Sequence, residues 1–167
     1  VGSLRIPPLN WVRPPLWRGF APWEKTGVLT QPKTGLDNLT FSELGVDQDM
    51  VDALAAKGIL EPCPMQTQTI PLGLGGQDII GQAKTGTGKT FGFGLPLLQE
   101  LGLDPEPGVQ ALVVVPTREL CIQVAEDLTT ASANRATRIV AIYGGKAYEG
   151  QIDELKAGAQ VVVGTPG

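Results

Sequence analysis

The chain has 167 residues, of which 42% are hydrophobic, so it can form one domain with a substantial core. The net charge of −4 is unevenly distributed: residues 1–35 carry five basic and one acidic side chain, and residues 36–167 carry eight basic and sixteen acidic ones. Because an acidic domain attracts nucleic acid weakly through its overall charge, any nucleic-acid contact must come from local arrangements of residues.

Neither the apolar runs nor the cysteines suggest a membrane or a secreted protein. The longest apolar run, 111–115, is too short to cross a bilayer, and the Pro- and Arg-containing start of the chain does not read as a secretory signal. Cys63 and Cys121 are the only cysteines, and histidine is absent, which argues against a disulfide framework or a zinc cluster. We therefore expect a cytoplasmic protein with no membrane contact.

Residues 1–35 are rich in Pro, Trp and Arg and show neither helical nor strand periodicity. They are predicted to be a disordered or irregular leader, linker or non-native segment. The alternative, that its tryptophans and arginines touch RNA bases, is disfavoured by their irregular spacing.

Regular patterns begin after residue 35 and predict three helices and a strand. DQDMVDALAAKG (47–58) has a helical apolar face, with Asp47 placed to cap it and Gly58 to terminate it. MQTQTIPLGLGG (65–76) predicts a short helix that ends at Pro71 or at the glycines after it. DIIGQA (78–83) reads as a strand, and KTFGFGLPLLQEL (89–101) as a helix with a kink near Pro96.

The remaining elements alternate between strand and helix. The ranges 110–116, 138–145 and 159–166 are apolar and rich in β-branched residues, and 118–132 and 150–158 are amphipathic. This alternation predicts βαβ units, hence an α/β fold with a parallel sheet covered by helices on both faces. Each strand is followed by Gly, Pro or Thr at its carboxyl end, where open α/β sheets bind ligands.

The segment GQAKTGTGKT (81–90) carries the clearest chemical signal. Residues 83–90 match A-x-T-G-x-G-K-T, the helicase-type variant of the phosphate-binding loop. Glycines let consecutive backbone N–H groups turn toward an anion, and the positive end of the next helix points to the same place. Lys89 is expected to contact the β- and γ-phosphates and Thr90 to bind Mg²⁺, which makes these two the predicted catalytic residues. The predicted phosphate contacts are Thr85, Gly86, Thr87, Gly88, Lys89 and Thr90.

From Phe41 to Gly167 the chain resembles the DEAD-box RNA helicases in the order and spacing of its motifs. GILEPCPMQ (58–66) is similar to the family's Q motif, which implies that Gln66 reads adenine and that Phe41 is the isolated upstream aromatic of the site. The amide of Gln66 offers a donor and an acceptor that suit the N6/N7 edge of adenine but not guanine. Cys63 stands where the family usually has threonine, which puts one hydroxyl contact in doubt but not the preference for ATP.

Three further segments resemble the family's RNA-binding motifs. PTREL (116–120) is similar to motif Ia, the pair 144–145 to the GG element, and TPG (165–167) to motif Ib. The resemblance implies contacts with the RNA sugar-phosphate backbone that do not depend on base sequence. The implied RNA-binding residues are Pro116, Thr117, Arg118, Gly144, Gly145, Thr165, Pro166 and Gly167.

The resemblance implies a RecA-like P-loop NTPase domain over residues 36–167, here incomplete, from an RNA helicase that uses ATP and Mg²⁺ to unwind RNA locally. These 167 residues contain neither a D-E-A-D element nor a second RecA-like domain, so we expect the chain by itself to hydrolyse ATP poorly. The remaining alternatives are a non-catalytic nucleotide-binding fragment, another P-loop NTPase and a DNA helicase.

Overall fold

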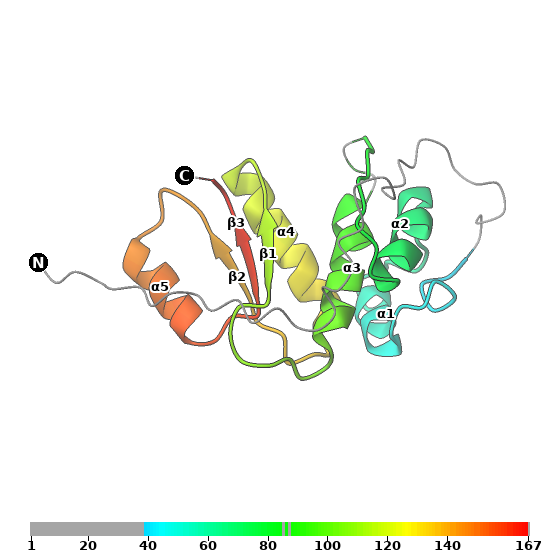
Figure 1. The fold of residues 1–167 in the computed structure, drawn as a ribbon, viewed down its shortest axis with the longest axis horizontal. Coiled ribbons are helices and arrows are strands. Elements are labelled where there is room, and N and C mark those ends of the chain that lie inside the picture. Colours follow the sequence, from blue (N-terminus) through cyan, green and yellow to red (C-terminus); the bar gives the residue numbers. More distant parts are fainter. Residues whose placement is uncertain (1–38, 85, 87, 167) are drawn as a thin grey trace, which may run out of the picture.

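A computed structural model describes residues 39–84, 86 and 88–166. The leader predicted for residues 1–35 lies outside the described residues. In Figure 1 a small parallel sheet stands beside a group of helices, with α4 between the sheet and α3. The elements in chain order are α1 (Gln48–Ala55), α2 (Pro64–Leu74), α3 (Lys89–Leu101), β1 (Ala111–Val114), α4 (Arg118–Ala131), β2 (Ile139–Ile142), α5 (Tyr148–Lys156) and β3 (Val161–Gly164).

The sheet has three parallel strands in the order β1-β3-β2, which confirms the α/β expectation. Its register pairs both Ala111 and Ile139 with Val161. Because all strands run in the same direction, their carboxyl ends meet at one edge of the sheet. The segments after β1, β2 and β3, which include the predicted RNA-binding motifs, therefore start side by side.

The two faces of the sheet are covered unequally. Val161 and Val163 are fully buried in the main core, to which α4 contributes Cys121, Val124 and Leu128. The other face holds a smaller cluster, in which Val140 and Val162 pack with Leu155 of α5. On this second face Leu112 and Val114 of β1 are 65% and 63% exposed. Helices thus flank both faces as predicted, but among the described residues this face of β1 stays uncovered, because α5 packs against β2.

The strand predicted for residues 78–83 does not form. In this range only Ile80 makes an isolated bridge, and the sheet that the described residues build contains no fourth strand. Ile80 is 64% exposed. An apolar run becomes a strand only where a neighbouring strand accepts its backbone hydrogen bonds, and the described residues provide no such neighbour here.

The helices pack closely where side chains are small. A Cβ on Gly94 of α3 would lie 2.4 Å from Cδ2 of Leu128 on α4, so a larger residue there would have to displace the buried Leu128 side chain. Helix α2 continues through Pro71 and ends before Gly75. Of the two predicted endings, the glycines are therefore the correct one. Among the described residues, no helix combines the length and the apolar character that a membrane span needs.

A buried arginine ties the first helix to the rest of the domain. The side chain of Arg135 is fully buried, and its guanidinium donates to Asp47, to both carboxylate oxygens of Asp49 and to the carbonyl of Leu98 at 2.7–2.9 Å. Asp47 does occupy the N-cap position of α1, but its side chain makes no capping hydrogen bond. The predicted cap is therefore wrong in its chemistry, since the Asp47 carboxylate serves the arginine instead.

Candidate functional site

The phosphate loop leads directly into α3. Gly86 and Gly88 adopt φ values of +80° and +67°, which other residues rarely adopt, and Gly88 forms the N-cap of the helix. Lys89 is the first helical residue, and its ammonium donates to the backbone carbonyls of Ala83 and Lys84. The loop thus holds its own lysine beside the open end of a helix, where N–H groups lack intrahelical partners. Thr85 and Thr87, also predicted to contact phosphate, lie outside the described residues.

Gln66 lies against this loop. It is buried near the start of α2, where its Oε1 accepts from the backbone N–H of Cys63 at 2.9 Å. Its Nε2 donates to the carbonyl of Gly88, also at 2.9 Å. A Cβ on Gly88 would lie 2.4 Å from the same Nε2, so glycine is required for this approach. The structure therefore brings Gln66 and the phosphate loop together across 22 residues of sequence.

Thr90, the predicted Mg²⁺ ligand, has a carboxylate as its neighbour. Its hydroxyl lies near the carboxylate of Asp127 on α4. The pKa of Asp127 is raised above the ordinary value chiefly by burial, and the Thr90 hydroxyl acts in the opposite direction. Within the described residues, no cluster of three or more His, Cys, Asp or Glu side chains could hold a metal. A hydroxyl and one carboxylate at a phosphate loop are nevertheless oxygen donors of the kind that Mg²⁺ shares with bound phosphates.

Phe41 is not at the loop surface. Its ring is 1% exposed and belongs to the main core, together with Leu44, Met50 and Leu54. In this arrangement Phe41 supports the segment that precedes α2 by packing. A direct contact between this ring and adenine stays a prediction.

The predicted RNA-binding motifs meet at the carboxyl edge of the sheet. Thr117 caps α4, its hydroxyl accepting from the N–H of Leu120 at 3.3 Å. Pro116 and Arg118 flank it and are exposed. After β3, the N–H of Thr165 donates to the carbonyl of Ile142, the last residue of β2, at 3.1 Å. The segments 116–118 and 165–166 are thus both attached to strand ends of one sheet, whereas Gly167 lies outside the described residues.

The Gly144-Gly145 pair follows β2 and lies beside Arg118. Gly145 has a φ of +84°, and a Cβ there would be 3.7 Å from Nη1 of Arg118. The guanidinium carbon of Arg118 lies 5.1 Å from the ring centroid of Tyr143. Arg118 and the glycine turn, predicted separately, are therefore neighbours in space.

Three residues of this region were missed by the sequence analysis. Asp127 gave no signal because one acidic residue on an amphipathic helix is normally solvated. Tyr143 reads simply as the end of a strand, and Gln151 as a polar helix residue. Only the tertiary structure places Gln151 under the glycine turn, where it accepts from the N–H of Tyr143 and donates to the carbonyls of Tyr143 and Lys146.

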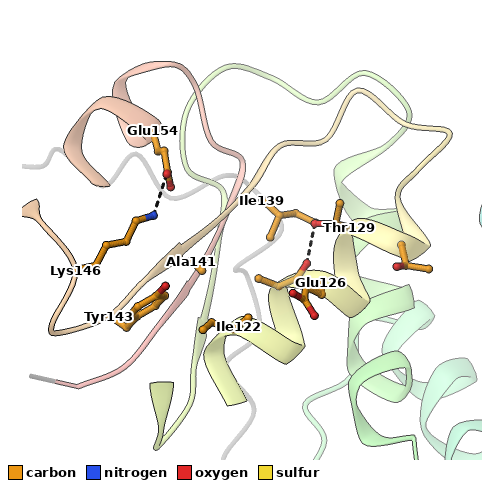
Figure 2. A pocket seen from close by; sticks show the side chains of 10 residues that line it. Ile122, Glu126, Thr129, Ile139, Ala141, Tyr143, Lys146 and Glu154 are labelled. Carbon is orange, nitrogen blue, oxygen red and sulfur yellow. Dashed lines mark hydrogen bonds and ion pairs between the residues drawn. The ribbon is translucent and has the colours of Figure 1, made fainter. Parts of the chain in front are cut away.

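A cavity of about 450 Å³ adjoins the same turn, between α4 and the edge strand β2. Figure 2 shows Tyr143 and Lys146 on the chain that leaves β2, with Ile122 of α4 across the cavity and Lys146 directed at Glu154. The ammonium of Lys146 and the carboxylate of Glu154 are 3.0 Å apart. Lys146 is thus engaged in an ion pair. Arg118, the other cation at the strand ends, forms no ion pair with a carboxylate of the described residues.

Comparison with known proteins places the chain in a family. The sequence profile of the DEAD/DEAH box helicases matches residues 63–167. The chain is 50% identical over 127 residues to the ATP-dependent RNA helicase CshA of Listeria monocytogenes, covering 76% of this chain and 24% of that protein. It is 49% identical to the DEAD-box ATP-dependent RNA helicase CshA of Geobacillus kaustophilus, covering 77% and 27%. The chain thus spans about a quarter of the length of these curated relatives.

Solved structures agree with this result. A DEAD box protein from Methanococcus jannaschii superposes with a TM-score of 0.70 at 41% identity, over 76% of this chain and 34% of that one. The RNA helicase Prp28 from Chaetomium thermophilum, solved with bound ADP, gives 0.70 at 36% identity, over 75% and 32%. These neighbours confirm the RecA-like α/β fold, and with the profile match they establish that the chain belongs to the DEAD/DEAH box helicase family.

Proposed function

We propose that the chain provides the ATP-binding site and part of the RNA-backbone surface of an ATP-dependent RNA helicase. The observation that carries the proposal is the hydrogen bond from Gln66 to Gly88, which joins the predicted adenine-reading side chain to the phosphate loop. A nucleotide needs both parts within reach of each other. The names of the CshA relatives support the same activity.

Adenine recognition would use the two polar atoms of the Gln66 amide, which already make hydrogen bonds within the chain. Its Oε1 faces the N–H of Cys63 and its Nε2 faces the Gly88 carbonyl, so neither polar end is left unsatisfied before ATP binds. Adenine offers an N6–H donor to Oε1 and an N7 acceptor to Nε2, whereas guanine offers O6 at the first position. Because a mispaired buried amide costs about 1–3 kcal/mol, Gln66 would favour ATP over GTP by about fivefold or more.

Phosphate binding would draw on Lys89 and the start of α3. The ammonium of Lys89 would move from the carbonyls of Ala83 and Lys84 to the β- and γ-phosphates. Its hydrogen bonds would be stronger there, because the phosphate oxygens are charged. Thr90 and Asp127 are the side chains that would hold Mg²⁺ with the phosphates. When bound, the ion supplies charge neutralisation at the phosphates.

RNA binding would occur at the carboxyl edge of the sheet. Arg118, the N-terminus of α4 and the Gly144-Gly145 turn lie together there and suit a sugar-phosphate backbone. ATP hydrolysis and duplex separation are proposed for the whole protein, since the chain spans about a quarter of its relatives. We place that protein in the cytoplasm on its sparse use of cysteine.

Competition of a fluorescent ATP analogue with ATP and GTP tests the nucleotide site. Gln66→Ala should lose the preference for ATP, and Lys89→Ala should weaken both nucleotides by about tenfold or more, because a charge-assisted contact is worth about 1.5–3 kcal/mol. Gln68→Ala on the same helix and Lys57→Ala in the exposed turn after α1 are the matched controls and should change neither. Equal competition by GTP in the parent chain would remove Gln66 from the proposal.

Exchanging RNA for DNA of the same sequence tests the second half of the proposal. Binding to the RNA strand that weakens with DNA would support contacts to the 2′-hydroxyl groups. Equal affinity for both would favour a DNA helicase or a general single-strand binder instead.

A further inference from the structure

We propose that Tyr143 is a positioning residue for RNA: its ring orders the Arg118 guanidinium beside the glycine turn, ready to receive a backbone phosphate. The inference rests on the RNA surface proposed above. It assigns a role to a side chain that no predicted motif contains.

The first step concerns what holds Arg118. This side chain is exposed at the first residue of α4 and makes no hydrogen bond or ion pair with the described residues. Its guanidinium carbon lies 5.1 Å from the Tyr143 ring centroid, within the range of a cation–π contact. Such a long side chain would otherwise sample many rotamers, and any ligand that bound it would have to order it.

The second step is that stacking leaves the useful atoms available. A cation–π contact with the face of a ring uses no carboxylate or carbonyl acceptor, so it leaves the guanidinium N–H donors for a ligand. A salt bridge to a carboxylate would order Arg118 equally well, but it would consume the donors that a phosphate needs. The contact with Tyr143 therefore orders the arginine without occupying it.

The third step concerns what holds the ring. Tyr143 is half-buried and packs against the main core. Its backbone N–H donates to Oε1 of Gln151 at 3.0 Å, and Nε2 of Gln151 donates to the carbonyls of Tyr143 and Lys146 at 3.3 and 3.2 Å. The buried Gln151 side chain thus fixes both ends of the turn that contains Gly144 and Gly145. The nearest atom of Arg118 lies 3.7 Å from where a Cβ on Gly145 would stand, so the ordered guanidinium borders the turn directly.

A double-mutant cycle on the full 167-residue chain tests the proposal, with the anisotropy of a labelled single-stranded RNA as the readout. Tyr143→Leu should weaken binding about two- to fivefold, the range that a solvent-exposed cation–π contact allows. Tyr143→Phe keeps the ring and should bind like the parent. In an Arg118→Ala background, Tyr143→Leu should have no further effect, because the ring has no guanidinium left to order.

Two additional readouts separate positioning from a change in fold and from failure of the proposed function. Arg118→Ala should reduce the slope of log K against log salt by about 0.7, the loss of one single-strand phosphate contact. Without RNA, the Nε–Hε NMR signal of Arg118 should carry a ring-current shift that Tyr143→Leu removes and Tyr143→Phe retains. An equal loss from Tyr143→Leu with and without Arg118 would overturn the positioning role. If the parent chain shows the ring-current shift but binds no RNA, the proposed function itself fails, although Tyr143 does order Arg118.

Discussion

Replacement of Arg135 by Met should be the most destabilising single change at a charged residue in this domain. Met retains an apolar stem but removes the guanidinium, which contacts both carboxylates at the start of α1 and the carbonyl of Leu98 in α3. Asn134, the preceding residue, also donates to the carbonyl of Asp49 at 2.8 Å. Loss of the arginine would therefore remove the ionic link from α1 to the Leu98 carbonyl, while the Asn134 hydrogen bond stays in place.

The size of this destabilisation depends on which partners of Arg135 water can reach once the guanidinium is gone. Removing one partner of a buried ion pair costs about 3–5 kcal/mol, because the other partner stays buried without compensation. The side chains of Asp49 and Asp47 are 22% and 47% exposed, so water can reach both carboxylates once the arginine is gone. The Leu98 carbonyl, by contrast, would lose its buried charged donor outright. We therefore expect the low end of that range, a loss of about 3 kcal/mol in the free energy of unfolding.

Urea unfolding followed by circular dichroism measures this free energy. Arg138→Met is the matched control, because Arg138 is exposed and its side chain makes a single hydrogen bond within the described residues, to the carbonyl of Ala157 at 3.2 Å. The control should cost no more than about 0.5 kcal/mol. A difference between the two variants below about 1 kcal/mol would refute the view that the buried guanidinium holds α1 in place. A changed slope in urea would show instead that the variant alters the unfolded or native ensemble.

Two further predictions concern the same carboxylate cluster and the uncovered sheet face. The hydrogen bond from Arg135 lowers the pKa of Asp49 below its ordinary 3.8, so the carboxylate stabilises the fold above that pH and loses this contribution as the pH falls through the lower folded pKa. The difference in unfolding free energy between the parent and Asp49→Asn should accordingly be full near neutral pH and shrink in acid; growth of the difference on acidification would contradict the assignment. Leu112→Lys should reduce self-association measured by light scattering, because Leu112 is 65% exposed on an edge strand. Leu103→Lys, at a side chain 59% exposed outside the sheet, is its control, and an equal reduction by both would mean that the edge strand is not the contact.

Much of the local structure could be predicted because local sequence determines it. Helix α3 has the predicted bounds of 89–101, and α4 begins at Arg118 after a threonine whose hydroxyl caps it. In these helices the apolar periodicity and the cap involve residues only a few positions apart, so a single sequence contains the whole signal. The phosphate loop is predictable for the same reason, since its glycines, lysine and threonine are consecutive.

The errors and omissions occur where a residue depends on a distant partner. Residues 78–83 have the composition of a strand but lack a neighbouring strand, and Asp47 has the position of a cap but pairs with Arg135, 88 residues away. Tyr143 and Gln151 gave no signal, because their contacts with Arg118 and the glycine turn arise only when the sheet brings the strand ends together. The sequence by itself thus determined the helix positions and the three strands that form the sheet, which short-range hydrogen bonds and periodicity specify. The tertiary structure decided which strands pair, what Gln66 and Arg118 touch, and how they are held, because those contacts join segments that only packing makes neighbours.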